Sequence, residues 1–414
     1  MSPARRRPAG AQSGYTLVEL MIAVLITSIV VGSLYSVSRQ ATETFNQQQR
    51  TAEMQLRLRF AMEQLRADIA RAGFMSTPNS FSDPRVCPKP TTLYQAVEIS
   101  RPSPVRVPLP SENRFVNPVS LRLTGNYSSV DEYAVAGITG GTIVLQNQTP
   151  QWARITTAAQ FNRIFLGGAG GRRLLRITSP NGQSQFVQVI GGVYQTASSA
   201  ALPQLLVTPP PVLVGDGSSG SSTGAACGIT GLGTGSTVAP ITMVEYAIDN
   251  VSAALPELYS SNATEAAAKS DLVRREFNLL PGPVEIPGST RVVGEYAVDL
   301  DVALAVDVGF PMGSATGMVS IRTIPFEDPT ITQVMGSLAT VGTGTARPER
   351  LRSLIVRLSI RDRQQDPAFP WVQRPASTFP LTRFRVFDDR LGSARVRTLI
   401  TEVAVPNVAM RNLR

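Results

Sequence analysis

The sequence predicts an α+β protein in which one long N-terminal helix, membrane-spanning in its first half, packs on a large, mainly antiparallel β-rich head. Three observations lead to this fold class. An apolar run extends from Tyr15 to Val37, and a helical pattern of apolar residues then continues to Gly73 without a proline. Short β-prone runs separated by turn residues fill the rest of the 414 residues, of which 43% are hydrophobic.

The first 14 residues are basic, small and polar, and they end in Gly14 directly before the apolar run. As a helix with a rise of about 1.5 Å per residue, residues 15–37 span about 33 Å, which matches a hydrocarbon core of about 30 Å. The arginines at positions 5 to 7 place the N-terminus on the cytoplasmic side of the membrane and the rest of the chain outside.

Two other readings of this N-terminus fit less well. A secretory signal usually has an apolar region of about 7 to 15 residues, which is shorter than this run. A plain membrane anchor does not explain Glu19, because an acidic group near the bilayer interior costs about 2.5 kcal/mol or more unless it finds a partner.

The residues GYTLVELM, from Gly14 to Met21, resemble the cleavage and methylation motif of type IV prepilins and the related pseudopilins. In that family a membrane-bound aspartic prepilin peptidase cuts after the glycine and methylates the new amino group. The resemblance implies that residues 1–14 are a leader peptide, that Tyr15 becomes the N-methylated first residue, and that Glu19 binds the N-terminal amine of a neighbouring subunit. A buried carboxylate opposite a buried ammonium neutralises both charges, whereas either alone is strongly disfavoured.

Two residues depart from the common pattern of this family. Tyr15 stands where phenylalanine is more usual, and Ser36 replaces the helix-kinking proline that is common in major pilins. The second departure favours a minor pilin or a pseudopilin.

From Arg39 the sequence is polar but keeps one amphipathic stripe, which we expect to pack on the protein's own sheet rather than on a coiled-coil partner. Its apolar members are Met54, Leu58, Met62, Leu65, Ile69 and Ala72. The spacing supports the pairs Arg59 with Glu63 and Asp68 with Arg71, and Gly73 is placed to end the helix. The helix end LRADIARAGF and the C-terminal ARVRTLITEVAVPNVAMRNLR also resemble PilW-like minor pilins.

We divide the chain into a leader, two helical segments and a β-rich head with two halves. The segments are residues 1–14 (leader peptide), 15–37 (transmembrane or filament-core helix), 38–73 (amphipathic continuation), 74–214 (first half of the head), 215–237 (Gly/Ser-rich loop or linker) and 238–414 (second half of the head). The boundary rests on the small residues of 215–237, which bury little apolar surface.

The first half of the head contains β-prone runs of four to seven residues. They are VSLRL, EYAVAGI, TIVLQ, RIFL, RLLRI and QFVQVI. The glycine cluster from Gly167 to Gly171 lies between RIFL and RLLRI, which predicts a hairpin turn. A phosphate-binding loop needs a GK[ST] ending and a following helix, and this segment has neither.

In the second half of the head, alternating apolar and polar residues predict strands at Val298–Val306, Leu354–Arg361 and Arg395–Val405. Ala263 to Arg275 is compatible with a short helix or with a strand through LVRREF.

Paired acids occur at Asp299 with Asp301 and at Asp388 with Asp389. Calcium binding or acid–base chemistry needs further oxygen ligands or a partner group, so we expect solvated strand faces, with Arg357 and Arg361 as partners. The chain lacks histidine and a GxSxG elbow, and we therefore expect no catalytic site, no metal and no cofactor.

Cys87 and Cys227 are the only cysteines, and they lack CxxC spacing. Outside the cytoplasm they can form a disulfide across a long loop; if reduced, they are two small buried side chains. The formal charge of +9 falls to 9 − 3 = +6 after removal of the three leader arginines, a modest value that leaves nucleic-acid binding as a weakly supported option.

The resemblance implies a minor pilin in type IV pilus assembly rather than an enzyme. Its implied partners are prepilin peptidase, other major and minor pilins through the N-terminal helices, and the inner membrane before assembly. The implied location is a single-pass inner-membrane protein with a periplasmic head, and later a pilus or pseudopilus. A type II secretion pseudopilin and a filament-tip protein that binds DNA or a surface are the alternatives.

Overall fold

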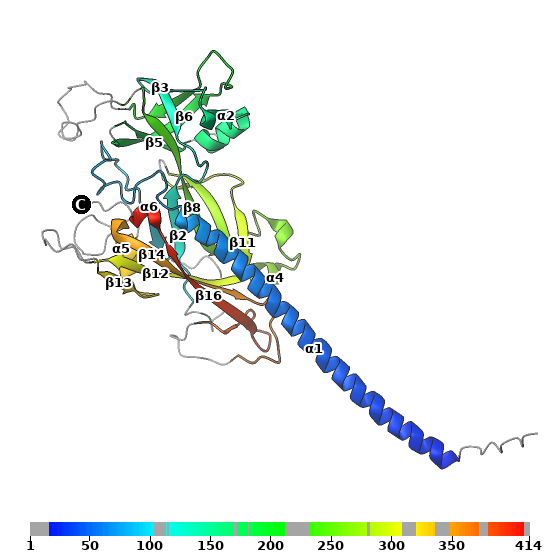
Figure 1. Cartoon of the computed structure of the whole chain (residues 1–414). Coiled ribbons are helices and arrows are strands. Elements are labelled where there is room, and N and C mark those ends of the chain that lie inside the picture. Colours follow the sequence, from blue (N-terminus) through cyan, green and yellow to red (C-terminus); the bar gives the residue numbers. More distant parts are fainter. Residues whose placement is uncertain are drawn as a thin grey trace, which may run out of the picture. The chain divides into compact units, whose positions relative to one another are not determined.

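The computed structural model describes residues 16–102, 113, 116–168, 172–180, 182–211, 232, 234–279, 282–308, 320–335, 348–371 and 380–409. The chain divides into two compact units, one ending at Glu53 and the other beginning at Met54. Helix α1, Leu17–Ala70, is continuous through both. The second unit contains all of the strands (Figure 1). The predicted α+β fold class is confirmed.

The part of α1 that belongs to the second unit, from Met54 to Ala70, buries the predicted apolar stripe. Met54, Leu58, Met62, Leu65 and Ile69 are all buried there. The helix ends at Ala70, and a tight turn follows in which the N–H groups of Arg71 and Ala72 donate three residues back. Gly73, the predicted end, lies in this turn with a left-handed φ of 76° and donates its N–H to the carbonyl of Thr124.

Six antiparallel strands close into a barrel, because β8 pairs with β3 on one side and with β5 on the other. The strands, in ring order, are β8 (Thr237–Asp249), β3 (Tyr133–Thr139), β4 (Thr142–Leu145), β7 (Gln204–Thr208), β6 (Ser184–Val193) and β5 (Leu174–Thr178). The barrel core includes Trp152, Phe161 and Phe165, which are supplied by short helices rather than by strands. These helices are α2 (Pro150–Ala153), α3 (Ala158–Phe161) and a π-helix (Asn162–Leu166).

The C-terminal half of β8 leaves the barrel and joins an open region of the same sheet, where it pairs with β2 and β9. The strands of this region are β1 (Val97–Ser100), β2 (Ser120–Gly125), β9 (Asp271–Asn278), β10 (Val284–Glu285) and β11 (Arg291–Glu295). Because β8 has 13 residues, one strand carries both the barrel and the open sheet.

A separate five-stranded antiparallel sheet completes the head (Figure 1). Its order is β13 (Ile321–Ile324), β12 (Ala297–Asp307), β14 (Leu351–Arg361), β16 (Ala394–Ala404) and β15 (Arg383–Phe384). Alternate residues of β12 share one apolar core with α1, β1, β2 and the second half of β8. Helices α5 (Thr330–Met335) and α6 (Pro406–Ala409) add to this core. Both sheets thus contribute to the core that buries one face of α1 beyond Met54.

Most of the predicted strands are confirmed, but the RIFL strand is wrong. Residues 162–166 form the π-helix, and Gly167 ends it with a left-handed φ of 68°. The predicted hairpin turn is therefore absent at Gly167 and Gly168, while Ala169 to Gly171 lie outside the described residues. The ambiguous segment contains both predicted elements, α4 (Ala263–Ala267) and then β9. Most of 215–237 also lies outside the described residues.

Candidate processing and assembly site

Glu19 lies in the first turn of α1, two residues after the helix begins. Its backbone N–H donates to Thr16 Oγ1 at 3.2 Å, and the backbone N–H of Thr16 donates back to Glu19 Oε2 at 3.5 Å. This reciprocal pair is a capping box, which satisfies two N–H groups that the helix itself leaves unpaired. The spacing Thr-x-x-Glu is its signature, and the sequence analysis missed this role of Thr16.

The capping box holds the carboxylate of Glu19 at the start of α1. Gly14 and Tyr15 lie outside the described residues, and Thr16 is the next residue along the chain. The positive end of the helix dipole favours a carboxylate in the first turn. Only Oε2 of Glu19 is engaged among the described residues, so Oε1 can accept a hydrogen bond from an incoming ammonium group.

The first part of α1, up to Val37, has the apolar composition that a membrane-spanning helix requires. Its best 18-residue window has a mean hydropathy of 2.4, and by length and composition the helix can cross a membrane. The hydroxyls of Thr27 and Ser28 donate to carbonyls one turn earlier at 2.7 Å, and those of Ser33 and Ser36 donate likewise at 2.8 Å. Because the helix satisfies these hydroxyls itself, they need no water. Glu19 is the single charge in residues 15–37.

Cys87 is partly buried beside the barrel core and is disulfide-bonded. Cys227 is the only other cysteine in the sequence, but it lies outside the described residues. The pairing of these two cysteines therefore stays a prediction.

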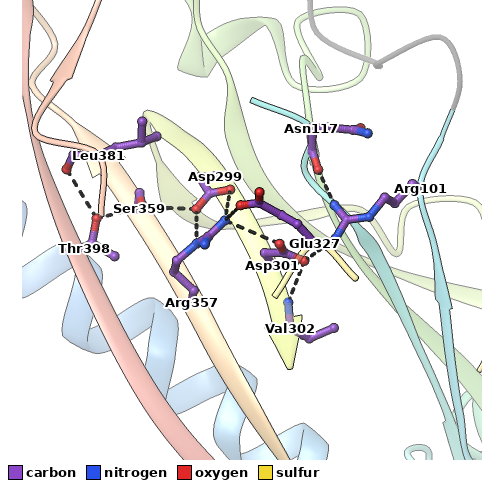
Figure 2. Close-up of polar contacts among 10 residues, drawn as sticks. All are labelled: Arg101, Asn117, Asp299, Asp301, Val302, Glu327, Arg357, Ser359, Leu381 and Thr398. Carbon is purple, nitrogen blue, oxygen red and sulfur yellow. Dashed lines mark hydrogen bonds and ion pairs between the residues drawn. The ribbon is translucent and has the colours of Figure 1, made fainter. Parts of the chain in front are cut away.

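The prediction that Asp299 and Asp301 lie on solvated strand faces is wrong. Both are only 1% exposed, because β12 is covered on both faces. Figure 2 shows the arginine contacts that replace water. Arg357 Nε donates to Asp299 Oδ2 at 2.8 Å, and Arg357 Nη2 reaches Asp301 Oδ2 at 3.4 Å. Arg101 Nη2 donates to Asp301 Oδ1 at 2.7 Å. Arg357 comes from the neighbouring strand β14, whereas Arg101 follows β1 of the other sheet.

The predicted partner Arg357 is thus found in this ionic cluster, whereas Arg361 is not. Arg361 donates instead to the carbonyls of Asp362, Arg363 and Ala268. The second acid pair, Asp388 and Asp389, is exposed in a turn.

Burial raises the pKa of Asp299 to about 6, although the facing Arg357 opposes this rise. In the unfolded chain the pKa of an aspartate is about 3.9. Between about pH 4 and 6 the folded state therefore binds a proton at Asp299 more tightly than the unfolded state does. The cost of ionising Asp299 is therefore absent below about pH 4 and fully present above about pH 6. We expect the unfolding free energy of the wild type, relative to an Asp299→Asn variant, to fall across this range by on the order of 2 to 3 kcal/mol.

Urea unfolding of both proteins at pH 4, 5, 6 and 7 measures this difference directly. Asp301 is present in both chains, but it repels Asp299 and shares Arg357 with it, so the difference reports the titration of Asp299 in the presence of Asp301. A difference that stays constant with pH would contradict the expected titration.

The comparison with known families identifies the N-terminal site. Residues 10–35 match the prokaryotic N-terminal methylation motif. No curated protein and no solved structure matches the chain. The match covers Gly14, Tyr15, Glu19 and the capping residue Thr16, and it confirms the resemblance noted from the sequence. With its apolar N-terminal helix and β-rich head, the chain is a type IV prepilin-like protein.

Proposed function

We propose that this chain is a PilW-like minor pilin that prepilin peptidase processes and that takes part in initiation or in the tip complex of a type IV pilus. The observation that carries the proposal is the methylation motif at residues 10–35, which overlaps the start of an unbroken helix of 54 residues. The role is structural rather than catalytic.

Processing comes first in the proposed mechanism. Cleavage after Gly14 removes the three leader arginines and creates a new amine at Tyr15, which the peptidase methylates. Until assembly the protein stays in the inner membrane as a single-pass protein with its head in the periplasm. The hydroxyls that the helix satisfies internally suit this stage.

Assembly then moves residues 15–37 from lipid into a bundle of pilin helices. Glu19 accepts the amine of a neighbouring major or minor pilin, which sets the axial position of each subunit. The capping box supports this role, because it holds the carboxylate at the helix end and leaves Oε1 for the incoming donor.

Two features support a minor rather than a major pilin. The helix runs through Ser36, the position where major pilins commonly have a proline. The head also holds an 11-stranded and a five-stranded sheet, which is large for a densely repeated subunit. The same two features fit a type II secretion pseudopilin, our second candidate, and a neighbouring secretin system with exported hydrolases would favour it.

The mature N-terminus tests the proposal. We expect expression of the full-length chain with prepilin peptidase to yield a product that mass spectrometry identifies as beginning with N-methyl-Tyr15, and expression without the peptidase to leave residues 1–14 in place. Gly14→Leu should abolish cleavage, because the bulky side chain replaces the residue before the cut.

Gly10→Leu is the matched control, since it makes the same change within the leader but away from the cleaved bond. An intact N-terminus in the presence of the peptidase, or a cut near Ser36, would reduce the protein to a membrane-anchored or secreted β protein.

A further inference from the structure

A cavity of about 1080 Å³ lies beside the barrel, in the second unit. Its wall is formed by the π-helix, by β6 of the barrel and by residues 286–291, which lead into β11. Small-molecule pockets usually have volumes of about 300 to 1,000 Å³, and this cavity lies at the upper end of that range. Leu166, Ile190 and Ile286 give the wall an apolar portion.

The charged portion of the wall is strongly basic. Arg163, Arg172, Arg173 and Arg291 line the cavity together with one acid, Glu276, so that the lining carries 4 − 1 = +3. Glu276 already accepts a hydrogen bond from Arg274 at 2.9 Å. Within the described part of the chain, none of the four lining arginines forms an ion pair with a carboxylate. Elsewhere in the head, buried Arg357 has carboxylate partners, whereas buried Arg361 is held by backbone carbonyls and does not line this cavity.

Arg173 is the most unusual member of this lining. It is 1% exposed, its Nη1 donates to Thr242 Oγ1 at 2.6 Å, and its Nε has no hydrogen-bond partner. Leaving a buried charged donor unsatisfied is unfavourable. Burial lowers the pKa of Arg173 to about 10, so its side chain is still charged at neutral pH. A buried, charged and incompletely paired arginine on a cavity wall is suited to an anion.

The backbone beside Arg173 is shaped to leave the guanidinium free. Gly167 has a left-handed φ of 68°, and a Cβ at this position would lie 2.7 Å from Asn278 Oδ1, 3.1 Å from Arg173 Nε and 3.2 Å from Arg173 Nη2. Only glycine combines this backbone conformation with space for the guanidinium. The preceding π-helix is a rare element that occurs frequently at functional sites.

We propose that this cavity binds a small organic anion whose phosphate or carboxylate group is received by Arg173, with Arg163, Arg172 and Arg291 at the rim. The apolar wall then contacts the carbon skeleton of the ligand. Arginine suits both groups, because its planar donors match their oxygens. This binding activity goes beyond the proposed assembly function, since it uses the head rather than the N-terminal helix.

A small ligand fits these observations better than nucleic acid does. Single-stranded nucleic acids are usually held by aromatic side chains that stack on successive bases, and no aromatic residue lines this cavity among the residues that the structure describes. Duplex phosphates lie on a convex surface, whereas these arginines line a cavity.

Calorimetry on the full-length chain in an uncharged detergent at low salt tests the proposal. The probes are glucose 6-phosphate, glucuronate and glucose. We expect saturable binding of glucose 6-phosphate, of glucuronate or of both, and none of glucose; the anion that binds identifies the group recognised. Absence of binding by both anions at millimolar concentration would overturn the proposal.

Variants locate the binding site. Arg163→Glu reverses an exposed rim charge and Arg173→Met removes the buried one, and each should weaken anion binding about tenfold or more. The control is Arg397→Glu, which makes the same charge reversal at a position on β16, away from the cavity. It should change the affinity less than about twofold.

A thermal unfolding midpoint close to that of the wild type for Arg163→Glu shows that loss of binding is not loss of folding. If Arg397→Glu weakened anion binding as much as Arg163→Glu, the affinity would belong to the general basic surface, and the cavity assignment would be wrong.

Discussion

Replacing Glu19 with alanine is expected to remove the chain from sheared filaments while cleavage after Gly14 continues. In the proposed bundle the carboxylate neutralises the amine of a neighbouring subunit, and without it that amine is a buried, unpaired charge. A charge in a membrane-like interior costs about 2.5 to 3.5 kcal/mol, which corresponds to about a hundredfold loss of incorporation. Quantitative immunoblots of sheared filaments and of membranes, from the same cells, measure the distribution.

Two matched variants separate pairing from helix capping. Glu43→Ala removes an acid from the same helix beyond the apolar run, where Glu43 forms only an exposed pair with Arg39, and it should leave incorporation unchanged. Thr16→Val removes the hydroxyl of the capping box but keeps the carboxylate. If Thr16→Val were as defective as Glu19→Ala, capping rather than charge pairing would explain the phenotype. Wild-type amounts of Glu19→Ala in filaments would remove the basis of the assembly mechanism.

The regions of the fold that could be predicted are those with a long, regular pattern. The stripe from Met54 to Ile69 keeps its three- and four-residue spacing over several turns, so its burial could be predicted from spacing alone. Strands β12, β14 and β16 each have 11 residues, long enough for a β pattern to be recognised.

The wrong prediction of a strand at RIFL shows that a short apolar run does not distinguish a strand from a helix. An apolar run of four residues suits a strand or a buried helix equally. The deciding signal lies upstream, where Thr157 accepts a hydrogen bond from the backbone N–H of Gln160 and caps α3. The spacing of Phe161 and Phe165 also places two rings on one helical face, and both are buried in the barrel core.

The pairing of charges could not be predicted, because each partner is remote in sequence. Arg101 reaches Asp301 across 200 residues, and nothing in the local sequence of either marks the other. The short-range pair predicted at the end of the helix is wrong. Asp68 pairs with Arg274 of β9 instead of Arg71, which donates to the carbonyl of Asn126. Tertiary contacts outweighed the weak local preference of exposed pairs. The N-terminal motif, in contrast, is contiguous and could be recognised from the sequence.

Replacing Asp68 with alanine should destabilise the head by about 3 to 5 kcal/mol, because it removes one partner of a buried ion pair. Asp68 is 6% exposed on α1, and its Oδ2 accepts from Tyr246 Oη at 2.7 Å and from Arg274 Nε at 2.8 Å. Tyr246 and Arg274 are cross-strand neighbours of β8 and β9, so one carboxylate joins the helix to two strands. Urea unfolding of the full-length chain in detergent measures the loss.

Glu63→Ala is the control on the same helix, since Glu63 has a side chain 75% exposed and only a 3.9 Å contact with Arg66. It should change the unfolding free energy by less than about 0.5 kcal/mol. The double variant Asp68→Ala with Arg274→Met should recover some of the loss, because it removes the arginine left without its helix partner. Equal effects of Asp68→Ala and Glu63→Ala would mean that apolar packing alone fixes the helix to the head. We expect the effect of Asp68→Ala to be much larger, because the Asp68 carboxylate joins this part of the helix to Tyr246 and Arg274 of the sheet.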